Sequence, residues 1–151
     1  MRVSIGNDHH GVKLKQQLIP WLKSLGHEVM DEGAGDTGAV DYPDYAAAVG
    51  RRVSSGEADR GLLICGSGVG MAITANKFPG VRAAVCSDDK AARLCRQHND
   101  VNVLCMSKEQ PSGADPQALV KTWLETEFEG GRHATRVEKI REIERQAKGC
   151  E

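Results

Sequence analysis

The sequence predicts an α/β fold: a three-layer α/β/α sandwich with a five-stranded parallel sheet and an extra C-terminal helix. Two observations predict it. Five short apolar runs have the length and composition of buried parallel strands, and segments with helical apolar spacing separate them. Strands that alternate with helices form parallel sheets with both faces covered. With 151 residues and no internal repeat or linker, the chain is expected to be a single domain, 1–151.

The strands are expected at residues 2–6, 27–31, 62–65, 81–86 and 101–106. Leucines at four-residue spacing predict the first helix, which Pro20 should kink or interrupt because proline lacks a backbone N–H. Further helices are expected from Pro43 to Gly56, over 71–77, from a Ser87 cap to about Gln97, and from Asp115 to Phe128.

The last helix follows Gly130-Gly131 and carries Thr135-x-x-Glu138, which matches a capping box. Its apolar stripe is narrow: Val137, Ile140 and Ile143. A stripe this thin suits a helix on the surface of the domain or against a second subunit.

Composition excludes several classes of function. The net charge of −1 produces no field that attracts nucleic acid, and two Phe, two Tyr and two Trp leave little for stacking on bases. No run reaches the ~18 apolar residues of a membrane helix. Five cysteines without a C-x-x-C pair suggest neither a disulfide framework nor structural zinc. We therefore expect a cytoplasmic protein that binds neither nucleic acid nor membrane.

The chemistry is concentrated in the segment Cys65-Gly-Ser-Gly-Val-Gly70, between an apolar run and a helix-like segment. Glycines let backbone N–H groups approach a ligand, and a helix N-terminus adds partial positive charge, so this loop favours anions. Such surroundings also favour the thiolate of Cys65, which makes it a candidate base or nucleophile. The alternative is a buried structural cysteine, since free cysteine is among the most buried residue types.

Three other groups follow predicted strands or helices, and each has a plain structural alternative. Asp8-His9-His10 can move protons or bind phosphate, or form a polar turn. A metal site there is disfavoured, because neighbouring residues on a strand point to opposite faces. His98-Asn99 ends a helix, where the helix dipole alone favours an imidazole. Arg132 and Arg136 have the spacing of a phosphate clamp, or belong to a solvated face.

A dinucleotide site is the main rival interpretation of the glycine loop. Asp88, after the next strand, lies about where an acid that binds ribose would be found. However, Met71 replaces the third glycine of that pattern, and a cofactor turn does not need Cys65 or Ser67.

Together these motifs resemble the type B ribose-5-phosphate isomerases, a sugar-phosphate isomerase family that includes galactose- and allose-6-phosphate isomerases. The matching segments span nearly the whole chain: 6–11, 41–45, 65–70, 75–77, 98–99 and 130–136. The resemblance implies a Rossmann-like sheet of order 2-1-3-5-4 and an aldose–ketose isomerisation without metal or cofactor. The chain departs from this pattern in four places: Ser67 stands where many members have threonine, His10 where a small or apolar residue is usual, Ser107-Lys108 where some members have an arginine, and Pro20 is also unusual.

The resemblance also implies a role for each matching residue. Cys65 would be the base that moves a proton between C2 and C1, and Ser67 would shuttle a proton between O1 and O2. His98, with Asp8, would open the furanose ring. The remaining substrate-binding residues would hold the phosphate or surround the enediolate and sugar oxygens: His9, Arg132 and Arg136 for the phosphate, and Gly66, Gly68, Val69, Gly70 and Asn99 for the sugar.

The implied assembly is a homodimer or a dimer of dimers in which His98 and Asn99 reach the partner's site. Ribose 5-phosphate is the expected substrate. Because the motifs do not encode substrate length, an isomerase of a six-carbon sugar phosphate remains an alternative. A second alternative is a module that binds nucleotides or sugar phosphates without catalysis.

Overall fold

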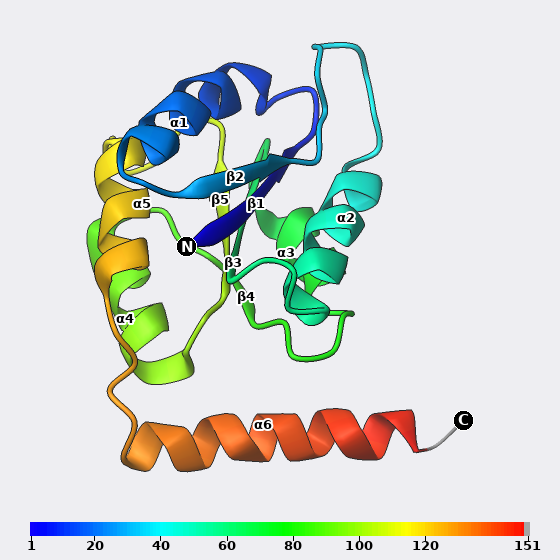
Figure 1. Cartoon of the computed structure of the whole chain (residues 1–151), viewed down its shortest axis with the longest axis vertical. Coiled ribbons are helices and arrows are strands. Elements are labelled where there is room, and N and C mark those ends of the chain that lie inside the picture. The colour runs from blue at the N-terminus through cyan, green and yellow to red at the C-terminus, as the bar shows by residue number, and fades with distance from the viewer. Residues whose placement is uncertain (150–151) are drawn as a thin grey trace.

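The computed structural model describes residues 1–149, and Cys150 lies outside them. Five parallel strands form one sheet in the order β2-β1-β3-β5-β4, which confirms the predicted architecture (Figure 1). The strands are β1 (Arg2–Asn7), β2 (Glu28–Asp31), β3 (Arg60–Cys65), β4 (Ala83–Val85) and β5 (Val103–Ser107). We call the edge where these strands begin the amino edge and the edge where they end the carboxyl edge.

Helices form a layer on each face of the sheet, as Figure 1 shows. One face is covered by α1 (Val12–Ser24), α4 (Asp89–Asn99) and α5 (Pro116–Glu125). The other is covered by α2 (Tyr42–Ser54) and α3 (Val69–Ala75). None of the described helices is long and apolar enough to cross a membrane.

The alternation of β3 explains why both faces are apolar. Leu62 and Ile64 pack with the first layer, whereas Leu63 and Cys65 pack with the second, and all four are buried. A parallel strand with helices on both sides needs apolar residues at consecutive positions rather than at alternate ones. The short apolar run in the sequence therefore marks the centre of the sheet and places Cys65 at its carboxyl edge.

Several predicted boundaries were wrong. Helix α1 continues through Pro20, where the buried leucines Leu18 and Leu22 hold both sides of the proline against the sheet. Strand β4 has three residues and α5 ends at Glu125, so both are shorter than predicted. Helix α4 is capped by Asp88 rather than Ser87: the Asp88 side chain accepts a hydrogen bond from the backbone N–H of Ala91.

Helix α6 (Arg132–Lys148) starts one turn earlier than its supposed capping box. Its N-cap is Gly131, so Thr135 lies inside the helix and cannot cap it. In Figure 1 the helix lies across the bottom of the molecule, away from the connection between β1 and α1 at the top. Of its predicted stripe only Val137 is buried, whereas Ile140 and Ile143 are 47% and 65% exposed.

A largely apolar groove of about 670 Å³ runs between α6 and the domain. Ile140 and Ile143 line one side of it, and Val81 and Ala84 line the other. Asn99, at the end of α4, also lines it.

Candidate active site

Strands β1, β3 and β5 end side by side, and their hydrogen bonds position the candidate base. Cys65 is paired with Ser107 across β3 and β5, and its carbonyl accepts a hydrogen bond from the Lys108 N–H at 2.8 Å. On the other side, the Asp8 N–H donates to the carbonyl of Ile64 at 3.1 Å. The Cys65 side chain is only 5% exposed. The sheet thus holds a thiol at the floor of its carboxyl edge.

The glycine loop turns back over this thiol. The backbone N–H of Gly68 points at the Cys65 sulfur with an N–S distance of 3.0 Å. Gly68 has a φ of +82°, and a Cβ there would lie 3.2 Å from the backbone of Met106, so both the conformation and the space require glycine. An N–H donor aimed at sulfur stabilises negative charge on it. The geometry therefore suits a thiolate base.

Two residues without a predicted role, Tyr42 and Ser107, also shape the loop. The ring of Tyr42 packs against Gly70 so closely that a Cβ there would lie 2.5 Å from its Cζ. The Ser107 hydroxyl donates to the carbonyl of Gly66 at 2.7 Å. Ser67, within the loop, is exposed, and its hydroxyl accepts the N–H of Val69 at 3.3 Å. The contacts of Tyr42 with Gly70 and of Ser107 with Gly66 join segments far apart in the chain, so no local sequence pattern reveals them.

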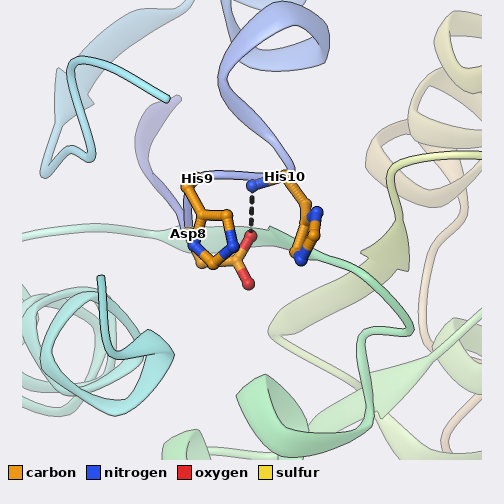
Figure 2. A group of neighbouring side chains, drawn as sticks. All are labelled: Asp8, His9 and His10. Carbon is orange, nitrogen blue, oxygen red and sulfur yellow. Dashed lines mark hydrogen bonds between the residues drawn. The ribbon is translucent and has the colours of Figure 1, made fainter. Parts of the chain in front are cut away.

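Asp8, His9 and His10 gather at the turn that follows β1 (Figure 2). The buried Asp8 carboxylate accepts the backbone N–H of His10 at 2.9 Å, and the two imidazole centroids lie 4.1 Å apart. Strand β1 ends at Asn7, so the alternation of side chains to opposite faces that was expected for His9 and His10 does not extend to them. One ligand atom from each of the three side chains lies within 4.8 Å of the others, a spacing that can hold a metal ion.

A buried lysine anchors the loop beside these histidines. The Lys15 ammonium donates to Asp31 at 2.6 Å and to the carbonyl of Ala34 at 2.9 Å. Further along this loop, the N–H of Val40 lies 3.4 Å from Nδ1 of His9. Lysine is almost never fully buried unless it is paired. The sequence signal was only a lysine among apolar residues of α1, which is too common to indicate this role.

His98, Asn99, Arg132 and Arg136 lie at the opposite, amino edge of the sheet. Helix α4 starts after β4 and returns the chain to the start of β5, so its last residues reach that edge. Arg82 lies just before β4 and Asp100 just after α4, and the two side chains form an ion pair at 2.8 Å. The end of α4 therefore lies beside the start of β4. One chain therefore does not bring these four residues to Cys65.

The amino-edge residues form a second cluster around a buried imidazole. His98 stacks on His133 with centroids 4.2 Å apart and planes 9° from parallel. Burial lowers the pKa of His133 from its usual 6.5, and the nearby charges of His98, Arg132 and Arg136 lower it further, against the opposing effect of Glu129. His98, Glu129 and His133 also place three potential metal ligands within 4.8 Å.

Asp88, the acid that a dinucleotide site would use to bind ribose, has a structural role instead. The Asp88 carboxylate caps α4 by accepting the N–H of Ala91 at 2.7 Å, rather than standing free to bind a ribose. What remains at the carboxyl edge is a thiol beneath a glycine loop, with an acid and two imidazole groups next to it.

A family model described as Ribose/Galactose Isomerase matches residues 3–140. The chain belongs to this family. It is 46% identical over 143 residues to ribose-5-phosphate isomerase B of Escherichia coli, with 95% of this chain and 96% of that protein covered.

Solved structures of the family agree with the fold. The ribose-5-phosphate isomerase B of Clostridium thermocellum superposes with a TM-score of 0.93 at 48% identity, over 97% of this chain and 99% of that one. The enzyme of Mycoplasma genitalium, solved with bound ribulose 5-phosphate, superposes with a TM-score of 0.90 at 39% identity, over 95% and 96%.

Proposed function

We propose that this family member interconverts ribose 5-phosphate and ribulose 5-phosphate. The observation that carries the proposal is the buried Cys65 thiol with the Gly68 N–H aimed at its sulfur, at the carboxyl edge of a parallel sheet. Ligands of such sheets bind at this edge. The names of the relatives, and the ribulose 5-phosphate bound in one of them, support this substrate.

In the proposed reaction the Cys65 thiolate removes the proton on C2 of the open-chain aldose, and an enediolate forms. The resulting thiol returns that proton to C1, while the Ser67 hydroxyl moves a proton from O2 to O1, so the product is the ketose. A proton beside a carbonyl is weakly acidic, so a base poised near neutral pH and preorganised donors for the oxyanion are both needed. The N–H groups of the loop Gly66–Gly70 supply such donors.

We infer that the site is completed by a second chain, in a homodimer or a dimer of dimers. His98 would open the furanose ring with Asp8 of the partner, and Asn99 would bind sugar oxygens. Arg132 and Arg136 would hold the phosphate together with His9. Two observations support this: these four residues lie at the far edge of their own sheet, and the groove beside them exposes Ile140 and Ile143.

Rates on three sugar phosphates test the substrate. We expect the highest kcat/KM for ribose 5-phosphate, above those for allose 6-phosphate and galactose 6-phosphate. A higher value for a six-carbon substrate would reassign the specificity within the family. No turnover of any of the three would refute the isomerase proposal and favour a binding protein.

We also propose that the reaction needs no metal, because a thiolate and loop N–H donors supply the base and the charge stabilisation. Exhaustive chelation should leave kcat unchanged. Loss of activity that a divalent ion restores would instead point to Asp8, His9 and His10 as its ligands.

The proposed location is the cytoplasm. The four described cysteines, Cys65, Cys86, Cys95 and Cys105, are free, which suits a reducing compartment.

A further inference from the structure

Two polar side chains are buried near the turn that carries Asp8 and His9 (Figure 2), and the proposed reaction gives neither of them a role. Lys15, on α1, is 3% exposed, and Asn7, the last residue of β1, is 0% exposed. A polar group loses its hydration on burial, so it is stable there only when it is hydrogen-bonded. The partners of Lys15 and Asn7 therefore show which parts of the molecule these residues hold together.

Both side chains donate to the carbonyl of Ala34. The Lys15 ammonium does so at 2.9 Å and the Asn7 amide at 3.3 Å. The same ammonium donates to the Asp31 carboxylate at 2.6 Å, and that carboxylate also accepts the N–H of Gly33 at 2.9 Å. Lys15 thus fastens the end of β2 together with the first residues of the loop that follows it.

Asn7 joins this loop to the turn after β1. Its backbone N–H donates to the carbonyl of Gly33 at 2.7 Å, and its carbonyl accepts the N–H of Ala34 at 2.8 Å. The side-chain amide of Asn7 also donates to the carbonyl of Asp8 at 2.7 Å. A short chain of hydrogen bonds therefore runs from Lys15 through Ala34 and Asn7 to the backbone of Asp8.

The far end of the same loop contacts His9. The N–H of Val40 lies 3.4 Å from Nδ1 of the His9 ring, which is at the long end of hydrogen-bond distances. An N–H group can donate only to a ring nitrogen without a proton, so this contact favours a neutral His9 with its proton on Nε2. A contact this long is maintained only while the loop stays in place, and Lys15 holds the start of that loop.

We propose that Lys15 is a positioning residue for the isomerisation: through Ala34 it holds the loop that orients His9, and through Asn7 it holds the turn at Asp8. The inference rests on the proposed function, in which His9 holds the phosphate and Asp8 takes part in ring opening, and it adds to that function. A neutral imidazole with its proton on Nε2 can donate a hydrogen bond to a phosphate oxygen from that nitrogen.

Lys15→Met tests the proposal, because it removes the ammonium and keeps an unbranched side chain. The fold should survive: the Asp31 side chain is 47% exposed and stays hydrated, so no buried charge loses its partner. We expect kcat/KM for ribose 5-phosphate to fall about ten- to a hundredfold, since a displacement of about 1 Å from remote changes can cost that much.

Leu22→Ala is the matched control. Leu22 is buried on the same helix and packs in the core, and neither Asp31 nor Ala34 is among the residues of that core cluster. Its truncation should lower the melting temperature through lost packing while kcat/KM stays within about twofold of the wild type. A loss of kcat/KM in Lys15→Met that Leu22→Ala matches at the same melting temperature would show a structural role only and overturn the proposal.

Nuclear magnetic resonance supplies a readout that general destabilisation does not move. At pH about 8, where an ordinary imidazole is neutral, the nitrogen-15 shifts of His9 report which ring nitrogen carries the proton. In the wild type Nδ1 should be unprotonated and the Val40 amide protected from exchange. In Lys15→Met the shifts should move toward those of free histidine and the amide should exchange faster. Shifts and protection like those of the wild type would refute the link to His9.

Asn7→Leu keeps the proposal testable if Lys15→Met does not fold. Among the described residues the amide oxygen of Asn7 has no hydrogen-bond partner, so this variant removes only the two contacts of the amide donor. We expect kcat/KM to fall about tenfold. In the double variant with Lys15→Met, the loss should be smaller than the product of the two single losses, because both residues act through Ala34. A loss equal to that product would mean that the two act separately.

The two kinds of measurement separate this inference from the proposed function. If the wild-type protein isomerises no sugar phosphate, the proposed function fails, and the shifts of His9 still test whether Lys15 holds the loop. If the wild-type protein is active and Lys15→Met retains its kcat/KM, the positioning inference alone fails.

Discussion

The two edges of the sheet hold the candidate functional residues in different ways. At the carboxyl edge, Cys65 and Asp8 are buried, and backbone hydrogen bonds from neighbouring strands position them. At the amino edge, Asn99, Arg132 and Arg136 are exposed on helix ends. A base must be placed precisely relative to a carbon, whereas a phosphate clamp needs long charged side chains that can reach. Each edge is suited to one half of the proposed site, and neither is complete by itself.

The largest expected effect is at the carboxyl edge. Cys65→Ala removes the proposed base, and kcat should fall about a thousandfold while binding of ribose 5-phosphate, measured by calorimetry, survives. A circular dichroism spectrum and melting temperature like those of the wild type would show that the fold is intact. Near wild-type turnover would remove Cys65 from the mechanism and leave the carboxyl edge without its base.

A mixture of two inactive variants tests whether the edges meet across chains. Cys65→Ala and His98→Ala should each be nearly inactive alone. In mixed dimers one site carries both changes and the other carries neither, so mixing under conditions that exchange subunits should restore activity, up to about a quarter of the wild-type value for random pairing of equal amounts.

Verification of exchange is the control for that experiment, for example by mass spectrometry of the intact mixed dimer. If mixed dimers form and remain inactive, Cys65 and His98 act in the same chain's site. The far-edge position of His98 would then require a conformation unlike the one described.

Arg136→Ala should act mainly through affinity. A remote contact to phosphate stabilises ground and transition states alike, so KM should rise about tenfold and kcat should change less than about threefold. Arg145→Ala is the matched control on α6, because Arg145 is 63% exposed and pairs with Glu138. If the two variants have the same KM, Arg136 belongs to a solvated face and does not bind the phosphate.

The smallest expected effect is on stability. The pKa of His133 is lowered in the folded protein, mainly by burial, so the unfolded chain binds more protons just below pH 6.5. The free energy of unfolding should therefore fall as pH decreases from 7 to 5. His133→Asn should make the free energy of unfolding depend less steeply on pH, by an amount that corresponds to less than one proton taken up on unfolding. The free energy is measured by denaturant titration at a fixed protein concentration.

His27→Asn offers a comparison for that measurement. Burial and the N-terminal amine also lower the pKa of His27, so it contributes a dependence of the same sign at a place without His98 or the arginines. If His133→Asn leaves the pH dependence unchanged, the stacked imidazole does not titrate as its surroundings predict, and the amino-edge cluster is less buried than described.

Much of the fold could be predicted from the sequence because its signals are local. Consecutive apolar residues before Cys65 indicate a strand covered on both sides, and glycines at 66, 68 and 70 indicate a loop that must come close to something. The order of strands was not such a prediction: it came from the resemblance to a family. The ends of helices and strands were predicted least well. Packing of Leu18 and Leu22 outweighs the hydrogen bond that Pro20 removes from α1, and Asp88 rather than Ser87 caps α4.

By itself the sequence determined which chemical groups the chain carries and the order in which they occur. Only the tertiary structure decided what each group faces. Tyr42 covers Gly70, Ser107 holds Gly66, and His98 stacks on His133, although nothing local in the sequence pairs them. The same holds for the two edges: α4 runs back from the carboxyl edge to the amino edge, so His98 and Cys65 lie at opposite edges of the sheet in one chain. The physical reason is that helical and strand periodicities act over a few residues, whereas these contacts depend on where distant segments meet once the core is packed.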